Sequence, residues 1–199
     1  MKFTRFFIFI FCFFIISSCQ NKNKKQGEIL PAYKLIKNFS EKIRPKTDLI
    51  LRSYAVNYDL PKNYEYRNNI ANFKTTYSIS KDQKDTVSLK KAREIFVSLT
   101  ESLLKEINAN LEIRPDLEAY PCTRDSLEIT IHFEDKNRVD LGQGISTVYF
   151  SKGKLTYEGY NIYEYTGQYP AHGKHFTIHE ETYEEALNIV QESGEVALF

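Results

Sequence analysis

The spacing of the apolar residues changes once along the chain, and this change constrains the fold more than any other feature. Between residues 89 and 107 the apolar residues advance by three or four, which places them on one side of a helix: Leu89, Ala92, Phe96, Leu99, Leu103 and Ile107. From Leu127 to Glu134 they alternate with polar residues, as in a strand with one buried and one solvated face. The chain therefore combines a long amphipathic helix with a half-buried strand.

Further strands are expected after residue 134. Glycine-containing turns at residues 140–144 and 151–154 predict strands over Ile145–Phe150 and over Leu155 to about Tyr165. A fourth strand is predicted over His175–His179, with Phe176 and Ile178 on the opposite face from the histidines. The sequence thus predicts an antiparallel β-meander of three or four strands.

Helices are expected on both sides of this meander. Residues 31–44 show helical spacing, and Pro45 is expected to end that helix. Thr182 and Glu185 form a capping box that starts a C-terminal helix, which is expected to end at Gly194. Residues 47–59 fit either a helix or a strand, and residues 61–80 fit a mixture of loop and strand. The predicted fold is α+β, with N-terminal helices, the meander, and the C-terminal helix packed on the sheet.

The first residues have the composition of a targeting segment. Lys2 and Arg5 precede an apolar run over residues 6–16, which is short for a membrane span but typical of a signal peptide. The motif Ile16-Ser-Ser-Cys19 that follows resembles the bacterial lipoprotein signal (aliphatic, small, small, Cys). This resemblance implies cleavage before Cys19, a diacylglycerol on its sulfur and acylation of the new amino terminus. An ordinary secretory signal or a short uncleaved anchor are the alternatives.

Three regions follow from this interpretation. Residues 1–18 are the signal peptide, residues 19–29 are the lipidated cysteine and a polar tether, and residues 30–199 form a single α+β domain. A mature chain of about 180 residues is long enough for one well-packed core. The acylated Cys19 would hold the protein on a lipid bilayer in the cell envelope. The lipoprotein resemblance, with Gln20 after the cysteine, favours the outer membrane where a bacterium has two.

Charge and cysteine content exclude other classes. The formal net charge is only +1, which argues against nucleic acid as a partner. Cys12 would leave with the signal and Cys19 would carry lipid, so Cys122 remains as a free thiol and no intrachain disulfide is expected. The sequence predicts no bound cofactor.

A cluster of histidines raises the question of a metal site. Three of the four histidines lie in the segment HGKHFTIH, residues 172–179, with Glu180 and Glu181 next to it. On a strand, His175 and His179 would lie about 13 Å apart, too far for good coordination of one ion. His172 and His175 could still converge, together with His132. A metal-assisted hydrolase of the His172/His175/His179 region is therefore the alternative function.

Tyrosines are concentrated between residues 157 and 169. On a strand, Tyr157, Tyr163 and Tyr165 would share one face and Tyr160 would lie on the other. Tyrosine offers a large rigid contact with a polar end, so these four side chains form a possible binding surface. They are equally good strand residues that half-cover a sheet. The sequence favours a non-enzymatic binding or scaffolding module, with another envelope protein as a partner. A secreted effector or inhibitor without a stable anchor is a third possibility.

Overall fold

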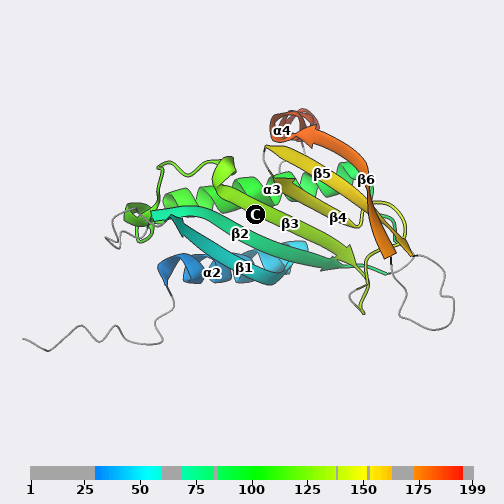
Figure 1. The fold of residues 1–199 in the computed structure, drawn as a ribbon, viewed down its shortest axis with the longest axis horizontal. Coiled ribbons are helices and arrows are strands. Elements are labelled where there is room, and N and C mark those ends of the chain that lie inside the picture. Colours follow the sequence, from blue (N-terminus) through cyan, green and yellow to red (C-terminus); the bar gives the residue numbers. More distant parts are fainter. Residues whose placement is uncertain are drawn as a thin grey trace, which may run out of the picture. The chain divides into compact units, whose positions relative to one another are not determined.

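Three helices lie against one face of a six-stranded sheet in the part of the chain that the computed structural model describes, residues 30–59, 69–82, 85–137, 139–151, 153–162 and 173–194 (Figure 1). The elements in chain order are α2 (Pro31–Thr47), β1 (Ile50–Asp59), β2 (Asn69–Ser80), α3 (Leu89–Ala109), β3 (Leu127–Glu134), β4 (Thr147–Ser151), β5 (Lys154–Ile162), β6 (Gly173–Thr182) and α4 (Tyr183–Glu192). Two short 3-10 turns, Arg114–Asp116 and Arg124–Ser126, lie between α3 and β3.

The order of the strands in the sheet is β1-β2-β3-β4-β5-β6, which is also their order in the sequence. Neighbouring strands are antiparallel except for β2 and β3, which run parallel. A parallel pair needs a long crossover connection, and α3 supplies it. The α+β class holds, but the predicted antiparallel meander of three or four strands is wrong, because the sheet has six strands and mixed direction.

The predicted placement of the helices is also wrong. We expected the helices to precede the strands except at the C-terminus, whereas α3 lies between β2 and β3 in the sequence. The ambiguous residues 47–59 contain the whole of β1, and the second part of residues 61–80 forms β2. Strand β2 pairs with the strongly alternating strand β3, and β1 pairs with β2. These pairings decide between the two interpretations that the sequence allows locally.

Helix α3 has the buried stripe that its spacing predicts. Ala92, Phe96, Leu99, Leu103 and Ile107 are completely buried, and Figure 1 shows the helix running behind the strands. The Ser88 hydroxyl accepts a hydrogen bond from the backbone N–H of Lys91 and caps the helix. On the same helix, the Glu101 carboxylate accepts hydrogen bonds from Arg124 and from the Tyr183 hydroxyl.

Helix α2 continues past the residue that was expected to end it. Pro45 lies in its last turn, and the helix ends at Thr47. The Thr47 hydroxyl donates to the carbonyl of Ile43 (3.0 Å), and the N–H of Asp48 donates to the carbonyl of Arg44 (3.1 Å). These bonds satisfy carbonyls that an end of the helix at Pro45 would leave free.

The two faces of the sheet differ in composition. On β3, Leu127, Ile129, Ile131 and Phe133 are buried against the helices, and the residues paired with them on β2 are Phe73, Thr75, Tyr77 and Ile79. The alternate positions are polar and point to the other face, which no helix of the described residues covers; this face is termed the open face. It carries Lys74, Thr76, Ser78, Glu128, Thr130, His132, Glu134, Thr147, Tyr149, Thr156, Glu158, Tyr160, His175 and Thr177.

Helix α4 begins with the predicted capping box. The Thr182 hydroxyl accepts from the N–H of Glu185, and the Glu185 carboxylate accepts from the N–H of Thr182. The helix buries Tyr183, Ala186 and Val190 and ends at Glu192, with Gly194 at a φ of 71° shortly after it. Among the described helices, none has the length and apolar content that a membrane span requires.

Candidate functional site

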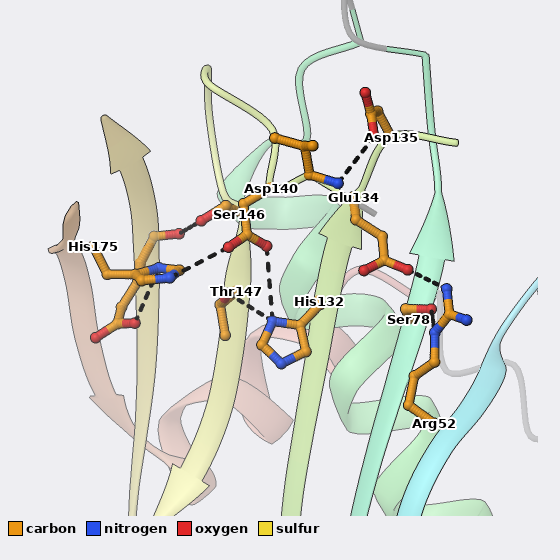
Figure 2. Close-up of polar contacts among 11 residues, drawn as sticks. Arg52, Ser78, His132, Glu134, Asp135, Asp140, Ser146, Thr147 and His175 are labelled. Carbon is orange, nitrogen blue, oxygen red and sulfur yellow. Dashed lines mark hydrogen bonds and ion pairs between the residues drawn. The ribbon is translucent and has the colours of Figure 1, made fainter. Parts of the chain in front are cut away.

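Two histidines on the open face converge on one carboxylate. Asp140 lies in the connection between β3 and β4, and its carboxylate is positioned between His132 of β3 and His175 of β6 (Figure 2). The distance from His175 Nε2 to Asp140 Oδ2 is 3.3 Å, and that from His132 Nδ1 to Asp140 Oδ1 is 3.9 Å. Asp140 therefore links two strands that are separated in the sheet by β4 and β5.

The connection that carries Asp140 is held by backbone contacts. The buried Asp135 carboxylate accepts from the N–H groups of Asn137 and Val139, and the N–H of Leu141 donates to the carbonyl of Phe133. Gly144 has a φ of 74°, and a β-carbon there would lie 2.7 Å from the carbonyl oxygen of Val87. Only glycine fits this close approach, which brings the chain back into β4.

A second carboxylate faces the other side of the His175 ring. His175 Nδ1 lies 3.7 Å from Glu158 Oε2, so each ring nitrogen faces a carboxylate. The hydroxyl of Tyr149 is 3.4 Å from Glu158 Oε1, which connects β4 to the same group. The His175 ring is thus placed between Asp140 and Glu158, and these two carboxylates have side chains that are each 21% exposed.

Other carboxylates of the open face pair with lysine or arginine. Arg52 contacts Glu134 and donates from Nε to the Ser78 hydroxyl (Figure 2). Lys74 lies 3.1 Å from Glu128, and Lys154 lies 3.9 Å from Glu180. Asp140 and Glu158 differ from these carboxylates because the basic side chains that they contact are histidines.

Burial of the Asp140 carboxylate affects its protonation. Desolvation raises the pKa of Asp140 above its ordinary value, and the neighbouring Glu134 and Glu158 add to this effect. His132 and His175 act in the opposite direction on the pKa of Asp140, without reversing it. The ionised form of Asp140 therefore depends on the charge of the imidazoles beside it.

His179 lies on the helix-covered face, apart from His175. A register shift between Tyr157 and Glu158 places His179 opposite Tyr157, whose side chain is completely buried on that face. The rings of His179 and Tyr157 are 5.8 Å apart, and His179 Nε2 is 3.5 Å from Glu181 Oε2. The bulge in β6 is the reason why the two histidines do not share a face.

A buried polar network occupies the space beneath His179. Arg93 of α3 donates two hydrogen bonds to the Glu181 carboxylate, at 2.8 and 2.9 Å, and the Tyr157 hydroxyl donates a third at 2.5 Å. Because Tyr157 is fully buried in this network, it is not available to a partner. Its predicted place in a binding surface is incompatible with that burial.

Tyr160 is on the open face and half-buried. Its ring centroid lies 5.0 Å from that of His175. A β-carbon on Gly173 would come within 1.9 Å of the Tyr160 ring, so the ring lies directly against the backbone of β6 at this glycine. The other predicted residues, Cys19, Tyr163, Tyr165 and His172, lie outside the described residues.

No group of three or more His, Cys, Asp or Glu side chains in the described ranges is arranged to hold a metal ion. His132 Nδ1 faces both the Thr147 hydroxyl (3.2 Å) and Asp140. In a nucleophile–base–acid triad the base uses its two nitrogens for the two partners, so this arrangement is not a triad.

Sequence reasoning identified His132 and His175 but missed Asp140, Glu158 and Tyr149. The sequence pattern places Asp140 in a turn and gives it no contact. For Tyr149 and Glu158, the available signal is their position in the alternation of β4 and β5, on the same face as His132. Comparison of the chain with protein-family models, curated proteins and solved structures finds no match.

Proposed function

We propose that this chain is a lipid-anchored envelope protein without catalytic activity, and that the open face of its sheet binds another component of the envelope. The observation that carries the binding role is the division of the sheet into a face packed against three helices and a face of ordered polar side chains. The helix-covered face supplies the stability of the domain. No helix of the described residues covers the open face, which leaves its exposed side chains to serve contact.

The composition of the open face supports this role. Tyr149 and Tyr160 present aromatic surface with a polar end, which is enriched in protein contact surfaces. The ion pairs and hydrogen bonds around them hold neighbouring side chains in place before a partner arrives. Preorganised side chains lose less conformational entropy on binding than free ones.

The anchoring role depends on Cys19 and on the polar residues that follow it. If the lipoprotein signal is used, the mature protein carries a diacylglycerol on the Cys19 sulfur and fractionates with membranes. Cys19→Ser should release the protein from the membrane fraction and remove the lipid mass from the intact protein. Cys12→Ser is the matched control, since Cys12 lies in the apolar run outside the motif, and it should change neither measurement. An unmodified sulfur at Cys19 in protein from its native host would refute the anchor.

The binding surface is tested by crosslinking and mass spectrometry in intact cells. Tyr160→Ala should remove the crosslinked partners while leaving the circular dichroism spectrum unchanged. Tyr54→Ala is the control, because Tyr54 is 36% exposed and packs against Tyr33 of α2. Equal recovery of partners from both variants would mean that the open face is not the contact surface.

A further inference from the structure

We propose that His175 is a proton-controlled link between the β3–β4 connection and strand β5, closed when both ring nitrogens carry a proton and open when one of them does not. This link is a property of the folded chain by itself. It goes beyond the proposed binding role and does not depend on it.

The positions of the two ring nitrogens carry the proposal. Nε2 of His175 is 3.3 Å from Asp140, and Nδ1 is 3.7 Å from Glu158. A carboxylate only accepts hydrogen bonds, and a neutral imidazole has one N–H and one lone pair. The neutral ring would therefore direct a lone pair at one of the two carboxylates. Only the imidazolium form offers a donor and a positive charge to both.

The surroundings of the ring add further charges. Three titratable groups lie directly against the His175 ring: Asp140, Glu158 and Tyr160. His132 and Glu134 act on the ring through Asp140, and Tyr149 acts through Glu158. Five of these six are carboxylates or tyrosines that carry no positive charge, and Glu134 is already paired with Arg52. A second carboxylate at Glu158 disfavours ionised Asp140 unless His175 is charged.

Loss of the proton should free Asp140 in preference to Glu158. Glu158 belongs to a strand that is paired on both sides, with Thr147 and with Thr177, and it also receives the Tyr149 hydroxyl. Asp140 belongs to the connection, where its backbone forms only an isolated bridge with Glu134 of β3 and its side chain contacts the two histidines. The connection between β3 and β4 is thus the part that detaches from β6. Imidazoles in general exchange their protons between about pH 5 and pH 8, so a test of the link spans that range.

Amide hydrogen exchange of the isolated protein tests the link. The N–H of Leu141 is the reporter, because it follows Asp140 and donates to the carbonyl of Phe133 at 3.2 Å. Protection factors, corrected for the intrinsic dependence of exchange on pH, are compared at about pH 5.5 and about pH 8. We expect the protection of Leu141 to fall about fivefold at the higher pH, the size of effect that one partly exposed ion pair produces.

Matched histidine variants separate this link from other titrations. His175→Asn should abolish the difference between the two pH values, while His179→Asn should retain it, because His179 contacts Glu181 on the other face. The amide of Ile131 in the middle of β3 checks that each variant is folded. A wild-type protection factor that does not change with pH, or a His175→Asn variant that keeps the change, overturns the proposal. Neither result bears on the crosslinking of Tyr160, which tests the binding role separately.

Discussion

Two buried hydroxyl groups, those of Ser40 and Thr75, differ in whether they have a hydrogen-bond partner. The Ser40 hydroxyl donates to the carbonyl of Ile36 at 2.8 Å and lies 3.0 Å from the hydroxyl of Tyr77. Thr75 is also buried beneath the helices, but its hydroxyl oxygen has no hydrogen-bond partner among the described residues. A buried polar atom without a partner loses its bonds to water and gains none in return.

Thr75→Val should therefore be neutral or stabilising. Valine has nearly the same shape as threonine and removes the unsatisfied oxygen, so we expect the free energy of unfolding to rise by up to about 1 kcal/mol. Urea denaturation measures this change. Ser40→Ala is the contrasting variant, which should lower the same quantity by about 1 kcal/mol because it breaks a satisfied bond. A Thr75→Val protein that is less stable by a similar amount would contradict the assignment.

Of the ion pairs described, the one between Arg93 and Glu181 should be the most sensitive to substitution. Their side chains are 10% and 5% exposed. Glu181→Gln leaves the Arg93 guanidinium buried without a charged partner, which costs about 3 kcal/mol or more of unfolding free energy. The exposed neighbour provides the control, since Glu180→Gln should change stability by less than about 0.5 kcal/mol. Equal changes in the free energy of unfolding for the two substitutions, measured by chemical denaturation, would show that the buried pair stabilises the fold no more than an exposed one.

At the scale of a residue, only part of the placement of the tyrosines can be predicted from the sequence. Alternation along a strand requires Tyr157 and Tyr160 to lie on opposite faces, and they do. Nothing in that alternation says which tyrosine is buried. The answer depends on Arg93 and Glu181, which come from distant parts of the chain.

Among the elements, the first residue of α4 can be predicted from only four residues of sequence. The capping box needs only a threonine and a glutamate three positions later, and both of its hydrogen bonds are present. These bonds favour the ionised carboxylate. The backbone N–H of Thr182, followed by its hydroxyl, holds the pKa of Glu185 below its ordinary value of 4.5.

This shift predicts a pH dependence for α4. A carboxylate whose pKa is lowered by folding stabilises the folded state above its unfolded pKa, and this contribution is lost as the pH falls through the folded value. Glu185→Gln should therefore weaken the protection of the first amides of α4 at pH 7, and the difference from wild type should disappear in acid below pH 4.5. Glu184→Gln is the control, because Glu184 is outside the capping box. A difference that persists unchanged in acid would exclude the carboxylate as its cause.

Strands β1 and β2 show where local patterns are insufficient. Both contain buried apolar residues, yet Asn72, Lys74 and Thr76 interrupt the pattern of β2 with polar side chains that face the open side. Only the parallel pairing with β3 turns these residues into a regular strand. The candidate site has the same origin, because His132 and His175 meet at Asp140 only when all the strands between them are in order.

For the molecule as a whole, buried tyrosines limit the stability of the native state at high pH. Burial raises the pKa of Tyr77 from 10.0 to about 12, and it also raises the pKa of Tyr157 and of Tyr183. A tyrosine with a raised pKa contributes its full stabilisation below the unfolded pKa and loses it as the pH rises through the folded value. The native state should thus lose stability above pH 10.

Absorbance at 295 nm, which follows tyrosine ionisation, measures this effect together with circular dichroism. The three buried tyrosines should ionise only as the protein unfolds, and Tyr120, which is 47% exposed, is the control position. Tyr77→Phe should reduce the dependence of the unfolding free energy on pH above 10, and Tyr120→Phe should leave it unchanged. Ionisation of all tyrosines without loss of structure would contradict the burial described.

The order of the strands has a consequence for biosynthesis. Every strand lies beside the ones that precede and follow it in the sequence, even though one of the five pairings runs parallel. A chain made from its amino terminus can therefore extend the sheet at a single growing edge, with β1 as its fixed starting border. No later segment has to be inserted between strands that are already joined.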